Sequence, residues 1–195
     1  ISRPAVRTGV PVNAPARRRG PGSRADASHP TRHDLVDAAV AVADRDGLDA
    51  LSINEVTREA GLAKGTFYVH FADRAALVLE LHRRFHDDLY ATIAAATAGL
   101  PPGPQRARAR VDAFLDGCRR QRGVRAMLLQ ARTEPGIIDE VTRRNDLTAR
   151  SLAEDLAGVV EHPLETARLL VAATAEVALH ELRAGRTLPR LRAAL

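Results

Sequence analysis

Hydrogen-bond donors are concentrated in one short stretch of this sequence. Four side chains within about two turns of a helix can donate to an oxygen acceptor: Lys64, Thr66, Tyr68 and His70. Phosphate oxygens and the edges of nucleic-acid bases are acceptors of this kind. Phe67 and Phe71 are one turn apart and are suited to anchor the opposite side of the same helix in a small core.

A capping signal precedes these donors and predicts the start of another helix. Ser52 is followed three residues later by Glu55, a capping box in which the hydroxyl takes a free first-turn amide and the carboxylate reaches back to the cap. Gly61 supplies the permissive backbone that a sharp turn between helices needs. A second short helix is expected from Ala63 or Lys64. Two short helices joined by such a turn are typical of a helix-turn-helix, whose second helix lies in the major groove of DNA.

The run from Ala60 to Leu77 resembles the helix-turn-helix of the TetR family of bacterial regulators. The matching positions are Gly61, Gly65, Thr66, Phe67, Tyr68, His70, Phe71, Arg74 and Leu77. The resemblance covers Thr31 to about Leu81, and it departs from the family at Ala63, where a serine is common, and at Arg74, where lysine is commoner. It implies a DNA-binding transcriptional regulator, with repression as the usual mode and an unknown small molecule as effector.

The family positions also imply roles for individual side chains. Tyr68 and Thr66 are expected mainly on phosphates, His70 on a phosphate or a base edge, and Lys64 on a base. Gly65 would let the backbone come close to DNA. For Asn54, an adenine or phosphate contact and a plain solvated position are equal alternatives. The complete set of predicted DNA-binding residues is Ser52, Asn54, Lys64, Gly65, Thr66, Tyr68, His70 and Arg74.

Net charge is distributed unevenly along the chain. Residues 1–30 contain six arginines and one aspartate, which accounts for the whole formal charge of +5. This segment is rich in Pro, Gly, Arg and Ala, so it is predicted to be a flexible arm. It is either an exposed tail or a basic arm whose Arg17, Arg18 and Arg19 reach phosphates or a minor groove. Residues 31–75 carry five basic and eight acidic side chains, so the predicted DNA-binding domain is not itself basic.

The rest of the sequence predicts an all-α protein of about nine helices. Thr31 is expected to cap a first helix that ends near Asp46, and Asp73 a long helix with an apolar residue every four positions up to Gly99. Apolar residues at helical spacing continue through the remaining sequence. The predicted organisation is the arm at 1–30, a three-helix DNA-binding domain at 31–75, and a C-terminal helical bundle for ligand binding and dimerisation at 76–195.

The predicted helix from Leu164 to Arg183 indicates how two copies of the chain could associate. Its polar residues form one narrow stripe and the remaining circumference is apolar, except at Glu181. Such a helix needs burial on more than one side. A homodimer through this helix and a short last helix from Leu188 is expected, with a buried helix in a monomer as the alternative. The dimer would bind a double-stranded, palindromic DNA operator.

The effector site is less evident from the sequence. The resemblance implies a cavity in the C-terminal bundle, and the candidate lining residues are Phe85, Tyr90, Phe114, Cys118, Met127, Gln130, Arg132, Glu176 and His180. A basic stretch between Arg119 and Arg132 is suited to an anionic effector, although a solvated helix face is the more ordinary interpretation.

Other functional classes find little support in the sequence. Catalytic motifs, paired cysteine ligands and cofactor loops are absent, so no catalytic residue, metal site or cofactor is predicted. The single cysteine, Cys118, and the lack of a long apolar run favour a cytoplasmic protein without a membrane span. An alternative from another class is a ligand-independent, architectural DNA-binding protein that uses the arm and the helix pair without sequence preference.

Overall fold

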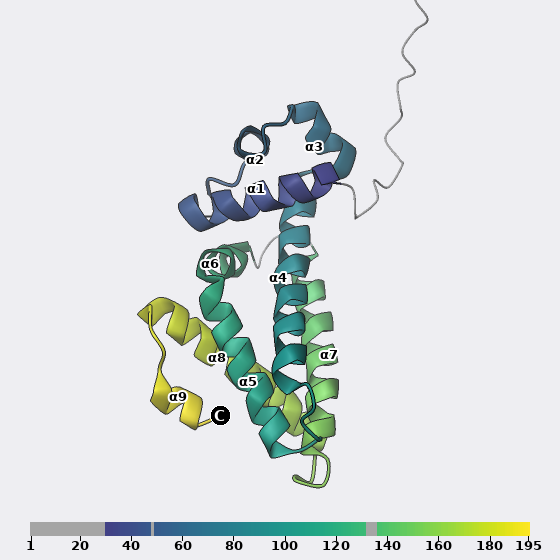
Figure 1. The fold of residues 1–195 in the computed structure, drawn as a ribbon, viewed down its shortest axis with the longest axis vertical. Coiled ribbons are helices and arrows are strands. Elements are labelled where there is room, and N and C mark those ends of the chain that lie inside the picture. Colours follow the sequence, from purple (N-terminus) through teal and green to yellow (C-terminus); the bar gives the residue numbers. More distant parts are fainter. Residues whose placement is uncertain (1–29, 48, 132–135) are drawn as a thin grey trace, which may run out of the picture.

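The computed structural model describes residues 30–47, 49–131 and 136–195 (Figure 1). These residues form nine α-helices and no strand, which confirms the predicted all-α fold. Helices α1 to α3 lie at one end of the molecule, and α4 runs from them along the length of the C-terminal bundle (Figure 1). The predicted arm lies outside the described residues, apart from Pro30.

Helix α1 (Pro30–Asp46) buries one apolar face and starts earlier than the sequence predicts. Thr31 is already inside the helix, so its expected role as the N-cap is wrong. The helix begins with Pro30, whose fixed φ suits a first helical position and whose missing amide costs nothing there. The predicted end is confirmed, because Gly47 adopts a φ of 80° and donates its amide to the Ala43 carbonyl at 3.0 Å.

Helices α2 (Ile53–Glu59) and α3 (Lys64–His70) form the predicted helix pair. Only half of the predicted capping box is formed. The Ser52 hydroxyl accepts from the Glu55 amide at 3.1 Å, but the Glu55 carboxylate binds Arg58 and does not reach back. The Ser52 amide instead donates to the Ala50 carbonyl at 2.8 Å. One cap therefore satisfies the first turn, and the turn between the helices uses Gly61 at a φ of 65°.

Helix α4 (Arg74–Thr97) connects the two ends of the molecule. The predicted cap is confirmed, because the Asp73 carboxylate accepts from the Ala76 amide at 2.8 Å. The apolar stripe is buried along its length: Leu77, Leu81, Phe85, Leu89 and Ile93. All of these except Ile93 belong to one continuous hydrophobic core that extends from α1 into the C-terminal bundle. The boundary at residue 75 therefore stays a prediction.

The C-terminal helices surround the lower part of α4 (Figure 1). Proline occupies a first-turn position in three of them, as is common where a helix amide has no partner. They are α5 (Pro104–Arg120), α6 (Arg122–Gln130), α7 (Ile137–Leu156), α8 (Pro163–Ala184) and α9 (Pro189–Ala193). Helices α7 and α8 pack against each other, and α6 packs against both α1 and α4.

Glu181 is the polar residue that interrupts the apolar part of α8, and its hydrogen bonds to α9 explain its presence there. Its buried carboxylate accepts from the Leu188 amide at 2.9 Å and from Arg192 at 2.7 Å. Arg192 also binds Asp116 of α5 at 2.8 Å. These bonds fasten the short last helix to its own bundle. Within the described ranges, no helix has both the length and the apolar character of a membrane span.

Candidate DNA-binding surface and ligand cavity

Helix α3 separates a buried aromatic side from an exposed donor side. The Phe67 side chain is fully buried and Phe71 is nearly so, with their ring centroids 5.5 Å apart. On the other side, Lys64 and Gly65 are exposed and Tyr68 is 52% exposed. The aromatic anchors therefore hold the helix so that Lys64 and the Tyr68 hydroxyl face outward.

Ion pairing within the chain distinguishes Lys64 from the arginines around it. Arg32 lies 3.0 Å from Glu80, Arg45 lies 3.2 Å from Glu59, and Arg58 binds Glu55. Within the part of the chain that the structure describes, the Lys64 ammonium forms neither an ion pair nor a hydrogen bond. Lys64 is thus a cation of this end of the molecule that stays available to an external acceptor.

The other predicted DNA contacts occupy different environments. Ser52 and Asn54 are exposed near the start of α2, whereas Thr66 and His70 are half-buried on α3. The half-buried Arg74 side chain donates from Nε to the Leu51 carbonyl at 2.7 Å. This bond ties the start of α4 to the loop before α2, so Arg74 also has a structural role that the sequence does not predict.

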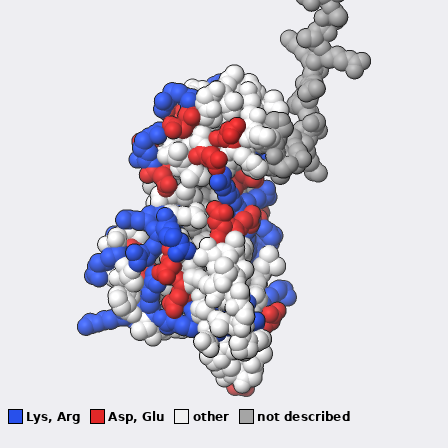
Figure 2. Space-filling view, viewed as in Figure 1, with Lys and Arg blue, Asp and Glu red and all other residues white. Residues whose placement is uncertain are grey.

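The visible surface around α1 to α3 is not uniformly basic. Figure 2 shows acidic and basic side chains intermixed over this upper part of the molecule. The distribution agrees with the excess of acidic residues counted for 31–75 in the sequence. Affinity for DNA must therefore come from a few well-placed groups, or from charge elsewhere in the chain.

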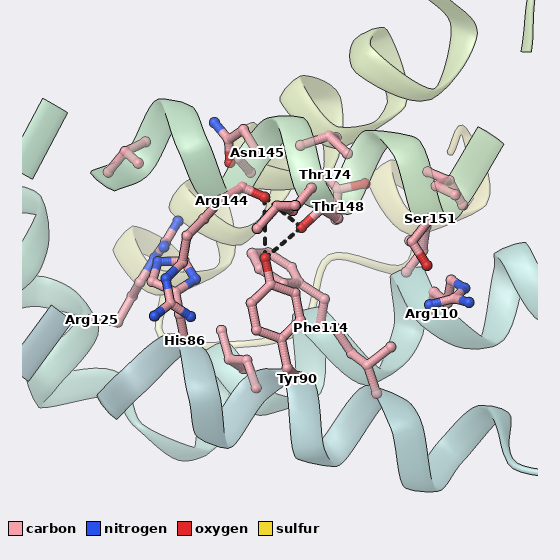
Figure 3. Close-up of a pocket in the computed structure, with 18 of the residues that line it drawn as sticks. His86, Tyr90, Arg110, Phe114, Arg125, Arg144, Asn145, Thr148, Ser151 and Thr174 are labelled. Carbon is pink, nitrogen blue, oxygen red and sulfur yellow. Dashed lines mark hydrogen bonds between the residues drawn. The ribbon is translucent and has the colours of Figure 1, made fainter. Parts of the chain in front are cut away.

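A cavity of about 190 Å³ lies within the C-terminal bundle, between α4, α5, α6, α7 and α8. Most of its wall is apolar, as the walls of ligand pockets usually are. Its polar lining groups come from all five helices: His82, His86, Tyr90, Arg110, Arg125, Arg144, Asn145, Thr148, Ser151 and Thr174. Figure 3 shows ten residues of this lining by name and the hydrogen bonds among Tyr90, Arg144 and Thr148.

Tyr90 is held in the middle of the cavity by helix α7. Its hydroxyl donates to the Arg144 carbonyl at 3.1 Å and lies 2.9 Å from the Thr148 hydroxyl (Figure 3). The buried Arg144 side chain binds Glu140 and Asp87, each at 2.6 Å. These bonds join α4 to α7 across the cavity and fix the Tyr90 ring before a ligand enters.

Two histidines of α4 are electrically neutral at the cavity wall. The ring centroids of His82 and His86 lie 4.4 Å apart. Burial lowers the pKa of His82 to about 4 and that of His86 to about 3. Nearby, hydrogen bonds from Arg143 and Arg144 lower the pKa of Glu140 to about 2. At neutral pH the imidazoles are therefore uncharged donors and acceptors, whereas Glu140 is ionised.

The sequence-predicted effector contacts separate into lining and core residues. Tyr90 and Phe114 line the cavity. Phe85 and Cys118 are buried in the continuous core and do not line it. Burial raises the pKa of the Cys118 thiol to about 11, so this group is protonated and unreactive at neutral pH.

The remaining predicted effector contacts lie away from the cavity or outside the residues that the structure describes. Gln130 of α6 is exposed and does not line the cavity. Glu176 and His180 are exposed on α8, where their side chains lie 3.2 Å apart. Arg132 and the Met127 side chain lie outside what the structure describes. The role of all these residues in ligand binding stays a prediction.

Sequence reasoning missed several polar lining residues. His82 and His86 are four positions apart beside the apolar stripe of α4, and this spacing was the signal that could have identified them. Arg125 belongs to the basic stretch that the sequence assigns to solvent, yet it is buried and lines the cavity. Among the described residues, no cluster of three potential metal ligands is present.

Comparison with known proteins agrees with the geometry of α2 and α3. A model of bacterial regulatory proteins of the tetR family matches residues 35–81, which contain both helices. This end of the chain is similar to the TetR family over the matched residues.

Curated relatives resemble the same end of this chain. The regulator YvdT of Bacillus subtilis is 41% identical over 44 residues, which are 23% of each chain. The regulator BetI of Vibrio campbellii is 35% identical over 83 residues, which are 43% of this chain and 41% of BetI. The matches thus span well under half of these relatives' length. Both are named as HTH-type transcriptional regulators, and neither name describes an enzyme.

Solved structures resemble the fold over most of the chain. A transcriptional regulator from Rhodococcus sp. RHA1 superposes with a TM-score of 0.68 at 24% identity, covering 83% of this chain and 90% of the other. A TetR-like regulator from the same organism superposes with a TM-score of 0.66 at 20% identity, covering 84% and 90%. These likenesses show a TetR-like fold that includes the C-terminal bundle.

Proposed function

We propose that this chain is a sequence-specific DNA-binding transcriptional regulator of the TetR family that works in the cytoplasm as a homodimer. The observation that carries the proposal is the outer face of α3, where Lys64 and Tyr68 are exposed opposite the buried Phe67. In a two-fold dimer, two copies of α3 would lie about one DNA turn apart and bind a palindromic operator.

The experiment is binding-site selection from random duplex DNA with the full chain, followed by measurements on variants. Lys64→Ala should erode discrimination between sequences, because Lys64 is assigned to a base. Tyr68→Phe should weaken all sequences alike, because it removes a phosphate contact. Arg58→Ala is the control, since Arg58 is exposed but bound to Glu55. An unchanged specificity profile for Lys64→Ala would reject the assignment.

We also propose that a small molecule in the cavity regulates DNA binding, with release from the operator as the simplest outcome. Support comes from α4, which carries Tyr90 and His86 in the cavity wall and begins at Arg74, whose side chain binds the Leu51 carbonyl in the loop before α2. A ligand shifts DNA binding only if it binds the DNA-incompetent state more tightly. The selected operator therefore permits a screen for ligands that release the protein.

The alternative function is an architectural DNA-binding protein that needs no ligand. It is favoured by the arginine-rich segment 1–30, which holds the whole net charge. Such a protein would bind selected and random duplexes with similar affinity, whereas a regulator should prefer its site by about a thousandfold or more. Comparing the full chain with one that begins at Ser28 tests the arm: a reduced salt dependence without the arm would indicate phosphate contacts.

A further inference from the structure

The lining of the cavity has a marked excess of basic groups. Three arginines and two histidines line it, and among the described lining residues there is no aspartate or glutamate. Two of the arginines are balanced by acids behind the wall. Arg110 binds the fully buried Asp155 at 2.6 Å, and Arg144 binds Glu140 and Asp87. The basic groups therefore face the cavity while the acids that balance them do not.

The basic groups are gathered at one end. Figure 3 shows Arg125, His86 and Arg144 close together, with Tyr90 and Phe114 toward the middle of the cavity. Helices α4, α6 and α7 each contribute one of these three nitrogen-bearing side chains. The cavity thus has a polar, cationic end that continues into an apolar, aromatic section.

His82 provides a second, independent sign of a missing ligand at this cavity. The residue lines the cavity and is only 3% exposed, yet its Nδ1 has no hydrogen-bond partner in the described structure. Buried polar atoms in proteins are nearly always paired, so an orphaned one requires an explanation. A neutral imidazole can carry its proton on Nδ1 and donate it to an acceptor that enters the cavity.

We propose that the effector is a small carboxylate with an apolar tail, its head bound where Arg125, His86 and Arg144 meet and its tail against Tyr90 and Phe114. The inference rests on the proposed regulatory function. A volume of about 190 Å³ lies below the range of about 300 to 1,000 Å³ that is usual for drug-sized ligands. A short-chain monocarboxylate is therefore favoured over a large or polycyclic one.

Electrostatics favours an anion over other ligands of the same shape. A carboxylate would receive charge-assisted hydrogen bonds from guanidinium and imidazole groups, which are stronger than neutral ones. A cation of equal size would lose its hydration beside Arg125 and gain no partner of opposite sign in the lining. A neutral amide would receive weaker hydrogen bonds only.

A matched ligand series tests the proposal on the unmodified protein. Calorimetric titration with hexanoate, hexanamide and hexylamine, without DNA, compares an anion, a neutral molecule and a cation of nearly equal shape. Hexanoate should bind at least about tenfold more tightly than either analogue. Equal binding of hexanamide or hexylamine, or no hexanoate binding up to millimolar concentration, would overturn the proposal.

Two substitutions on α6 test whether the carboxylate of hexanoate binds at Arg125. Arg125→Met should lower hexanoate affinity about tenfold and hexanamide affinity much less, because the amide loses only a weaker hydrogen bond. Arg122→Met is the control, since Arg122 is exposed one turn away and does not line the cavity. An equal effect of the two substitutions would contradict the assignment, and the unfolding curve of each variant shows that it is folded.

The regulatory role is measured separately on the selected operator. Hexanoate should release the protein from DNA at the concentration at which it fills the cavity. Selective binding without release would refute the effector assignment, while sequence-specific DNA binding would stand. Failure to select any operator would instead refute the proposed function, whatever the outcome of the ligand titrations.

Discussion

Gly65 lies in the first turn of α3, where the fold itself does not require a glycine. Its φ is not positive, and a Cβ there would meet no atom within 4 Å. We expect Gly65→Ala to raise the free energy of unfolding by up to about 1 kcal/mol, because alanine favours a helix. The same methyl group should weaken DNA binding by occupying the space that DNA needs. Urea unfolding and operator binding measure the two effects.

Gly61 provides the control in the same helix pair. Its φ of 65° lies in a region that strains an alanine, so Gly61→Ala should lower the free energy of unfolding by about 1 kcal/mol. Gly65→Ala with unchanged operator affinity would contradict the assigned approach of DNA to this backbone.

At the scale of residues, the sequence predicts local features better than distant ones. The caps at Ser52 and Asp73 depend on neighbours three positions away, and the structure contains both. The bond from Arg74 to the Leu51 carbonyl joins residues 23 positions apart and has no sequence signature. The burial of Arg125 is likewise set by helices far away in the chain, so a charge pattern alone assigned it to solvent.

At the scale of elements, the start of α6 packs unusually close to the end of α1. The Asp44 carboxylate of α1 accepts from the Val124 amide of α6 at 3.0 Å, which satisfies a first-turn amide. A Cβ on Gly123 would lie 2.7 Å from the Asp44 Cα. Glycine disfavours a helix, but Gly123 lies inside α6, where its lack of a side chain permits this contact.

Gly123→Ala should therefore force α6 away from α1. We expect it to lower the free energy of unfolding by about 1 to 3 kcal/mol, as overpacking does. Asp44→Ala, which removes only the cap, should cost about 0.5 to 2 kcal/mol. Urea unfolding measures both variants and Gly65→Ala. Gly65→Ala reports the effect of helix propensity alone, so a loss of stability in Gly123→Ala reports the steric effect. Equal stability of Gly123→Ala and the natural chain would disprove the close approach.

The neutral histidines of α4 predict how stability depends on pH. A base with a lowered folded-state pKa binds fewer protons than the unfolded chain between its folded and unfolded values. Stability contributed by His82 is therefore complete above its unfolded value of about 6.5 and falls as the pH decreases toward about 4. The loss should reach about 1.4 kcal/mol per pH unit for this histidine, and His86 adds a loss of the same sign.

Urea unfolding between pH 4 and 8 measures this slope. His82→Leu should reduce the slope by up to about 1.4 kcal/mol per pH unit. Val69→Ala should leave it unchanged, because it removes no titratable group from the exposed face of α3. Identical slopes for His82→Leu and the natural chain would show that His82 is not the group responsible.

Helix type and order were predictable because apolar residues recur at helical spacing, but helix ends were less so. Helix α7 ends at Leu156, although Val160 beyond it still packs against the cluster of Leu152, Leu156 and Ala167. Gly158 adopts a left-handed φ of 75°, which ends the helix. The apolar pattern therefore continues past a helix end that the backbone of one glycine sets.

At the scale of the whole molecule, the outer face of α8 is the proposed dimer surface. Leu169 is 73% exposed, and Ala172 and Ala173 beside it are also exposed in the single chain. Small residues permit close helix approach, and an exposed leucine on such a face gains from burial. We expect Leu169→Glu to weaken the dimer, because dimerisation would bury an unpaired charge.

Light scattering coupled to size exclusion measures the dissociation over a dilution series. Ala41→Glu is the control, since Ala41 is exposed on α1, at the DNA-binding end. A Leu169→Glu protein that dimerises as strongly as this control would refute α8 as the interface. Operator affinity should fall along with the dimer, since both copies of α3 are needed.

The continuous core along α4 also limits how segments of this chain can be exchanged with those of related proteins. Leu77, Leu81 and Phe85 share one core with α1 and with the C-terminal bundle. A chimera that joins its first 75 residues to a foreign bundle would replace half of that core with side chains shaped for another partner. A segment that can be transplanted must therefore include α4, and the new bundle must have an α6 whose first turn can donate an amide to Asp44. Operator specificity is better exchanged by substitutions on the surface of α3.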